Sequence, residues 1–141
     1  LLRLILIGLY GGSGVILARV LVVDDYADLR SMIVTFLNLY SSFQVVGEAG
    51  NGSEAVQMVE QLKPEVVLMD NLMPIMDGLT ATRLIKEQHP DIYVIIYSGL
   101  GEGEKVQQFK EAGVDLHLNK PLDLETLVIS MEKLLGANPG L

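Results

Sequence analysis

VVLMDNLMPIMDG, residues 66–78, carries the strongest structural signal in this chain. Its first four residues are an apolar run of strand length, and the run ends on Asp70. Pro74 and Gly78 then favour a turn, and a helical pattern follows. A strand that ends in an acid before a turn and a helix is how α/β proteins present a reactive group at the carboxyl edge of a parallel sheet. Because an isolated buried charge is costly, Asp70 needs polar partners.

The composition is that of a single acidic domain. The 141 residues carry a formal net charge of −8 and no cysteine. No basic patch stands out, so we expect no direct nucleic-acid binding by this chain. The lack of cysteine excludes disulfides and thiolate metal sites, and it suits a reducing, cytoplasmic location.

Residues 1–17, LLRLILIGLYGGSGVIL, differ in composition from the rest. As a helix they would be about 25 Å long, shorter than the roughly 30 Å hydrocarbon core of a bilayer, and the glycines at 11–14 would break it. We expect an extension outside the domain: a non-native or mis-started segment, a native arm that packs on the domain or a partner, or a membrane or export signal. Of these, we do not favour a membrane role. The domain itself is expected to span 18–136, followed by a short tail at 137–141.

Strand-like and helix-like patterns alternate through the domain. The continuous apolar run at 19–23 is typical of a strand buried on both faces, hence of a parallel sheet. Apolar residues at steps of three and four predict helices, and Tyr40 and Val106 belong to such apolar stripes. The predicted strands are 19–23, 43–49, 66–69, 92–97 and 115–118, and the predicted helices are about 26–40, 51–63, 79–89, 102–112 and 122–136. This order predicts a doubly wound α/β fold, a five-stranded parallel sheet with helices on both faces.

Polar side chains follow four of the predicted strands. Asp24 and Asp25 come after the first, Asp70 after the third, Ser98 after the fourth and Lys120 after the fifth. In a parallel sheet these ends share one edge, so the carboxylates are expected to crowd together and to require a cation. Mg²⁺ suits oxygen ligands of this kind, with Mn²⁺ as an alternative. A carboxylate, a divalent cation, a lysine and a hydroxyl together favour phosphoryl transfer, with the phosphoryl donor brought by another molecule.

At this point the motifs resemble a known family. The Asp24-Asp25 pair, Asp70 with the following MPIMDG at 73–78, Tyr97-Ser98-Gly99 and Asn119-Lys120-Pro121 are similar to the receiver domain of two-component response regulators, of which CheY is the minimal case. The resemblance covers about residues 18–136 and implies the flavodoxin-like strand order 2-1-3-4-5. VVGEAGNG at 45–52 is similar to receivers of the NarL/LuxR type, which precede a DNA-binding domain.

The resemblance also implies a role for each residue of the metal site. Asp70 would accept the phosphoryl group. Asp25 would bind Mg²⁺ directly and Asp24 mostly through water, with Asp70 and the backbone carbonyl of Leu72 as further ligands.

Other positions would contact the phosphoryl group or pass on the signal. Lys120, joined to Pro121 by a cis peptide bond, would contact the phosphoryl group, and Ser98 would be the switch hydroxyl. His117 stands at the switch position where the family has Tyr or Phe. Leu72 and Leu100 offer no polar group to orient an attacking water, so we expect slow self-dephosphorylation.

The partners implied are a sensor histidine kinase or phosphotransfer protein, and a second copy through the face of the fourth helix, fifth strand and fifth helix. The chain would be a signalling module rather than an enzyme. Two other functions stay open: a degenerate receiver that serves as a binding platform, and a Mg²⁺-dependent phosphatase of the haloacid-dehalogenase type. The phosphatase class carries Asp-x-Asp after its first strand, whereas this chain has Asp24-Asp25 there.

Overall fold

A computed structural model describes residues 18–99 and 103–136, and it has the predicted alternation of strands and helices. The strands are β1 (Ala18–Val23), β2 (Phe43–Ala49), β3 (Val66–Asp70), β4 (Tyr93–Ser98) and β5 (Leu116–Asn119). The helices are α2 (Ala27–Tyr40), α3 (Gly52–Leu62), α4 (Gly78–Gln88), α5 (Val106–Ala112) and α6 (Leu124–Gly136), with a 3-10 turn, η1 (Gly103–Lys105), before α5. The expectations for residues 1–17, 137–141 and Leu100 fall outside the described residues.

The five strands form one parallel sheet in the order β2-β1-β3-β4-β5, so the predicted fold class and strand order are confirmed. The central strands β1, β3 and β4 are almost fully buried, because their apolar runs face helices on both sides. The edge strand β2 keeps buried residues only at its two ends, Phe43 and Ala49. Because all strands point the same way, Asp24, Asp70, Ser98 and Lys120 come to one edge of the sheet.

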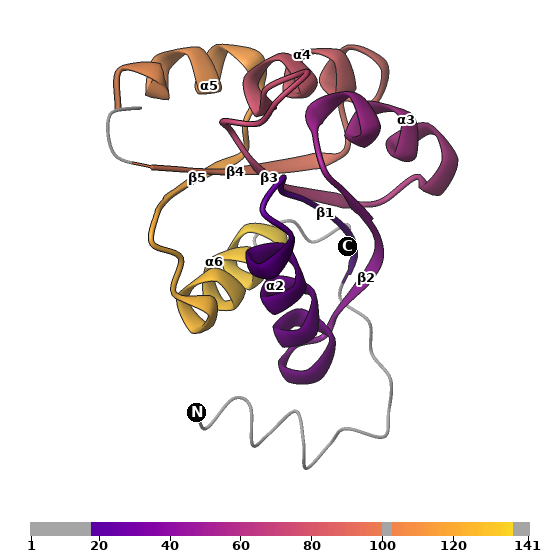
Figure 1. The fold of residues 1–141 in the computed structure, drawn as a ribbon, viewed down its shortest axis with the longest axis vertical. Helices are drawn as coiled ribbons and strands as arrows, with labels where there is room; N and C mark the ends of the chain where they lie inside the picture. Colours follow the sequence, from indigo (N-terminus) through magenta and orange to yellow (C-terminus); the bar gives the residue numbers. More distant parts are fainter. Residues whose placement is uncertain (1–17, 100–102, 137–141) are drawn as a thin grey trace.

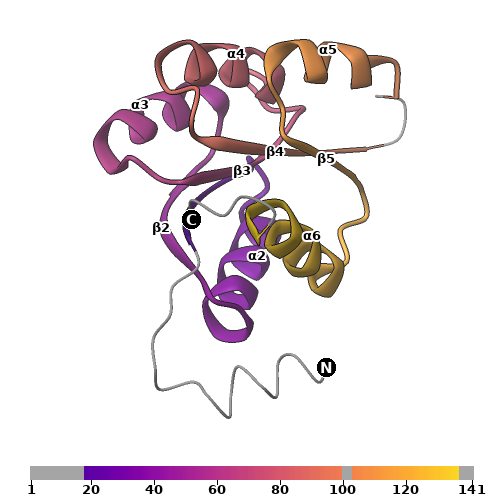
Figure 2. The ribbon, with the colours of Figure 1, turned by 180° about the vertical axis from the view of Figure 1, so that it is seen from behind.

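The helices divide into two layers. α2 and α6 cover one face of the sheet, and α3, α4 and α5 cover the other (Figure 1). Figure 2 shows the same division from behind. Each layer closes its own apolar core: Ile33, Leu37 and Met131 on the first side, and Val59, Ile85 and Phe109 on the second. The sheet therefore separates two cores, and the polar strand ends lie where both cores stop.

Local signals in the sequence set the helix ends. The Asn51 side chain accepts a hydrogen bond from the Glu54 amide at 2.9 Å, and Asp77 accepts one from the Thr80 amide at 2.8 Å. Both are N-caps that satisfy amides in the first turn. Gly113 ends α5 with a φ of 98°, which a residue without a Cβ adopts at low cost. Asparagine and aspartate at N-caps and glycine after the last turn are residue types that favour these roles.

Two expected core positions are wrong. Tyr40 is 46% exposed and Val106 is 37% exposed, although both fit the apolar stripe of their helices. Tyr40 is the last residue of α2, where its ring packs 5.2 Å from that of Phe36. Val106 begins the short helix α5, which buries only Phe109 and Ala112. In both cases the exposed residue is at an end of its helix.

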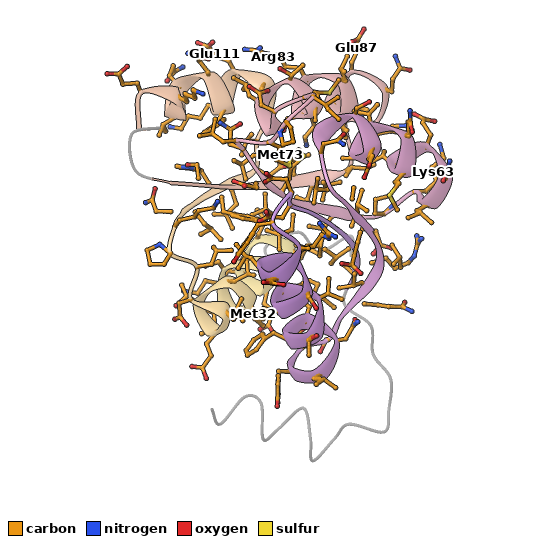
Figure 3. All side chains as sticks on the ribbon, in the orientation of Figure 1. Met32, Lys63, Met73, Arg83, Glu87 and Glu111 are labelled. Atoms are coloured by element: carbon orange, nitrogen blue, oxygen red, sulfur yellow. The ribbon has the colours of Figure 1, made fainter. Side chains whose placement is uncertain are left out.

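The outer surface of the second layer is charged. Arg83 and Glu87 on α4 and Glu111 on α5 point away from the sheet (Figure 3). Within the part of the chain that the structure describes, we find no helix with the length and apolar character needed to cross a membrane.

Candidate functional site

The end of β1 places one acid inside the protein and one outside. Asp24 is fully buried, whereas Asp25 is exposed. The Asp24 amide donates to the carbonyl of Ala49 at 3.0 Å, which continues the pairing of β1 with β2 by one residue. Its carbonyl accepts a hydrogen bond from the Arg30 guanidinium at 2.5 Å. The backbone of Asp24 is thus fixed from two sides, while Asp25 is left facing solvent.

The loop at 71–77 joins the end of β3 to α4 and brings the start of the helix back to the strand end. Asp70 is 3% exposed, and the Asn71 amide beside it donates to the Tyr97 carbonyl at 3.2 Å. Asn71 also accepts two hydrogen bonds, one from the Gly78 amide at 2.8 Å to its carbonyl and one from the Leu79 amide at 3.0 Å to its side chain. A Cβ at Gly78 would lie 2.5 Å from the Asp70 carbonyl oxygen, so only glycine fits there. These hydrogen bonds and the close approach of Gly78 hold the start of α4 against Asp70.

Lys120 reaches Asp70 from the end of β5. Its amide donates to the Ser98 carbonyl at 2.8 Å, and the Lys120–Pro121 peptide bond is cis. The Lys120 Nζ lies 3.1 Å from Asp70 Oδ1, an ion-pair contact. Among the described residues, this buried oxygen accepts no hydrogen bond besides the contact with the Lys120 ammonium. The Asp70 carboxylate therefore has a countercharge but an incomplete set of hydrogen-bond partners.

Burial changes the acidity of Asp70. Its pKa rises from 3.8 to about 6, chiefly because the carboxylate is buried. The Lys120 ammonium opposes this rise, and the negative charge of Asp24 adds to it. At neutral pH Asp70 is ionised about tenfold more often than not.

Asp24, Asp25 and Asp70 form an acidic cluster, in which one oxygen of each carboxylate lies within 4.8 Å of the others. Three like charges at this spacing, two of them buried, repel one another unless a cation lies between them. A cation between the three acids would also give Asp70 Oδ1 a further partner. Carboxylate oxygens are ligands that hard divalent cations prefer, so the residues fit a metal site of that class.

The predicted switch residues contact each other directly. Ser98 is buried, and its Oγ lies 2.6 Å from Nε2 of His117 on the neighbouring strand. The His117 ring is half-buried and packs 5.1 Å from the ring of Phe109 on α5. Ser98 on β4 and Phe109 on α5 are thus connected through a single side chain, that of His117.

Leu72, the remaining residue predicted for the site, follows Asp70 by two positions. Its side chain is 58% exposed and points away from the core. Such a position leaves room for solvent beside the strand end but supplies no polar side chain.

Sequence reasoning missed Tyr97 as a member of the site. Its hydroxyl donates to Asp24 Oδ2 at 2.5 Å, and its ring lies 5.5 Å from the Lys120 Nζ. Burial, with the nearby charge of Asp24, raises the pKa of Tyr97, so the hydroxyl keeps its hydrogen. The available signal was a hydroxyl-bearing aromatic residue at the last position before Ser98, in a strand that is otherwise aliphatic at its end.

Comparisons with known proteins agree with this geometry. The family model described as "Response regulator receiver domain" matches residues 20–132. The chain is 36% identical over 115 residues to response regulator protein VraR of Staphylococcus aureus, covering 82% of this chain and 55% of VraR. It therefore spans about half the length of that relative.

Solved structures give the same result. A DNA-binding response regulator of the LuxR family from Staphylococcus aureus superposes with a TM-score of 0.79 at 27% identity, covering 84% of this chain and 98% of that one. The CheX–CheY–BeF3–Mg²⁺ complex from Borrelia burgdorferi superposes with a TM-score of 0.76 at 28% identity, covering 82% of this chain and 87% of that one.

Proposed function

The chain belongs to the response regulator receiver family, and from that premise we propose that Asp70 accepts a phosphoryl group in a Mg²⁺-dependent reaction. The donor would be a sensor histidine kinase or a phosphotransfer protein in the cytoplasm. The observation that carries the proposal is the state of Asp70: a buried carboxylate that faces Lys120 at 3.1 Å and has two further acids beside it.

The acidic cluster would hold the cation. Asp25 and Asp70, with the carbonyl of Leu72, would bind it directly, and Asp24 would bind mostly through water. Both Asp24 oxygens already accept a hydrogen bond, from the Tyr26 amide at 2.8 Å and from Tyr97 at 2.5 Å, which supports an indirect role. When bound, a divalent cation neutralises negative charge on the carboxylates and on phosphoryl oxygens. The similar CheY lies in a complex with BeF3 and Mg²⁺, so Mg²⁺ is the first cation to test, with Mn²⁺ second.

The transfer itself needs an ionised nucleophile. A carboxylate oxygen of Asp70 attacks phosphorus, and the bond from phosphorus to the histidine nitrogen of the donor breaks, with the electron pair going to that nitrogen. A pKa of about 6 leaves Asp70 ionised at neutral pH. The Lys120 ammonium is placed to stabilise the negative phosphoryl oxygens as the bond to Asp70 forms.

The signal would leave through Ser98 and His117. A new phosphoryl group on Asp70 adds negative charge and acceptor oxygens close to the carboxyl edge. The Ser98 hydroxyl, now 2.6 Å from His117, would respond to it and change the contact between His117 and Phe109. The surface affected is that of α5, β5 and α6, through which we expect a partner or a second copy to bind. DNA binding, as named for the LuxR-family neighbour, would belong to a segment beyond this domain.

The test is phosphorylation by acetyl phosphate with Mg²⁺, followed by intact mass. We expect one adduct of about 80 Da in the wild type and none in Asp70→Asn, or after removal of Mg²⁺ with EDTA. Asp91→Asn, an exposed acid away from the site, is the matched control and should be labelled like the wild type. Steady turnover of phosphate esters would instead identify a phosphatase, and no adduct and no turnover would identify a binding platform.

A further inference from the structure

Tyr97 joins two parts of the site that the sheet keeps apart. It lies one residue before the end of β4, is fully buried, and packs in the core covered by α2 and α6. Because β3 separates β4 from β1, the side chain has to cross the end of β3 to reach Asp24. Its hydroxyl arrives there and donates to Asp24 Oδ2 at 2.5 Å.

The contact gives the second oxygen of Asp24 a hydrogen-bond donor. Oδ1 accepts from the Tyr26 amide at 2.8 Å and Oδ2 accepts from Tyr97. One bond comes from the chain just after Asp24 and the other from a strand 73 residues away in sequence. With a donor on each oxygen, the plane of this carboxylate is fixed before any cation arrives.

The same side chain also faces the lysine. The Lys120 Nζ lies 5.5 Å from the centroid of the Tyr97 ring and 3.1 Å from Asp70 Oδ1. An ammonium at this distance from an aromatic ring is attracted to it, more strongly where water is scarce. The Lys120 ammonium thus lies between the Tyr97 ring and the Asp70 carboxylate, in contact range of both.

We propose that Tyr97 is a positioning residue of the phosphorylation site: its hydroxyl orients Asp24 for cation binding, and its ring holds Lys120 beside Asp70. The inference rests on the proposed function. It assigns separate effects to the hydroxyl and to the ring of Tyr97, which can be tested one at a time. The hydroxyl acts on the cation, and the ring acts on the phosphoryl transfer.

Two variants separate these parts. Tyr97→Phe removes the hydroxyl and keeps the ring, and Tyr97→Leu removes both. Calorimetric titration with Mg²⁺ alone, without a phosphoryl donor, should give a Kd about three- to tenfold weaker for both variants. In phosphorylation by acetyl phosphate at saturating Mg²⁺, the initial rate should fall several-fold further for Tyr97→Leu than for Tyr97→Phe, because only the leucine loses the contact with Lys120.

The matched control is Tyr93→Phe, which removes a hydroxyl from the same strand and the same sheet face at its far end. It should leave both the Mg²⁺ Kd and the saturated rate unchanged. If Tyr97 only fills space, the Tyr97 variants will lower the melting temperature while Kd and rate stay at wild-type values, and the proposal is overturned. A tighter Kd in Tyr97→Phe overturns it too.

Failure of the Tyr97 proposal can be told apart from failure of the proposed function. If the proposed function fails, the wild type itself takes up no phosphoryl group. The calorimetric Kd of Tyr97→Phe still tests the orientation of Asp24, because that measurement needs no phosphorylation. A Tyr97→Leu variant that fails to fold removes only the second comparison, since Tyr97→Phe keeps nearly the same volume.

Discussion

Asp24 and Asp70 end neighbouring strands of the same sheet and are buried to almost the same degree, yet their surroundings differ. Each oxygen of Asp24 accepts a hydrogen bond from a protein donor. Asp70 Oδ1 has the Lys120 ammonium beside it, and among the described residues it accepts no other hydrogen bond. The difference indicates that burial alone does not decide what an acid does. Complete hydrogen bonding makes a carboxylate a fixed support, and incomplete hydrogen bonding leaves one ready to bind something else.

The largest expected effect comes from removing the Lys120 ammonium, the positively charged group that faces Asp70. Lys120→Ala leaves the hydrogen bonds of Asp24 in place and takes the positive charge away from Asp70. The initial rate of phosphorylation by acetyl phosphate at saturating Mg²⁺ should fall about 100-fold, because the negative phosphoryl oxygens lose their ammonium partner. Intact mass at timed points measures this rate. Lys110→Ala, an exposed lysine on α5, is the control, and a loss of less than about threefold in Lys120→Ala would contradict the assigned role.

The next effect concerns stability without metal. The pKa of Asp70 is raised from 3.8 to about 6, so the folded protein binds this proton more tightly than the unfolded chain does. Between these two pH values the free energy of unfolding therefore decreases as pH rises. Above about pH 6 Asp70 is ionised in the folded protein, and the whole loss of stability caused by its buried charge is present. Asp70→Asn removes it and should stabilise the metal-free protein at pH 8 by about 1–2 kcal/mol, with a smaller gain as the pH approaches 4.

Asp24→Asn sharpens the contrast. It also removes a charge, but it weakens the hydrogen bonds from Tyr26 and Tyr97, so its gain in stability should be smaller than that of Asp70→Asn. Urea unfolding in EDTA, followed by circular dichroism, measures both variants. An Asp24→Asn protein that is as stable as Asp70→Asn would show that the two acids are equivalent.

The smallest effect concerns Leu72, the exposed residue two positions after Asp70, and the lifetime of the phosphoryl group. Leu72 supplies no polar side chain there, so the phosphorylated wild type should lose its group over minutes or longer. Leu72→Asn should shorten this lifetime several-fold, because an amide can orient the attacking water. The decay of the phosphorylated mass after removal of the donor gives the lifetime. Leu39→Asn, another exposed leucine, should behave as the wild type, and loss within seconds in the wild type would refute the expectation.

Local patterns predicted the sheet and the acids at its edge. The run at 66–70 is apolar up to its acid, and its neighbours in the sheet follow the same rule, so topology alone brings Asp24, Asp70 and Lys120 together. Tyr97 could not be predicted in this way. Its contacts depend on a side chain that crosses one strand to reach another, and its position before Ser98 in the sequence marks a hydroxyl but not how far that hydroxyl reaches.

The wrong core assignments have a similar origin. Periodicity shows which side of a helix is apolar, but it does not show where the sheet beneath that helix ends. Tyr40 and Val106 continue an apolar stripe to the very end of their helices, and both are exposed there.

The contact between Ser98 and His117 has a consequence for how hydrogens are shared. A hydroxyl has one hydrogen to donate and lone pairs to accept. When His117 Nε2 is unprotonated, Ser98 donates to it at 2.6 Å, and turning that hydrogen toward a new acceptor breaks the bond. When Nε2 carries the hydrogen, the imidazole donates and Ser98 is free to donate elsewhere at the same time. The position of the imidazole hydrogen thus decides whether Ser98 has to give up its bond to His117 before it can donate to a new acceptor.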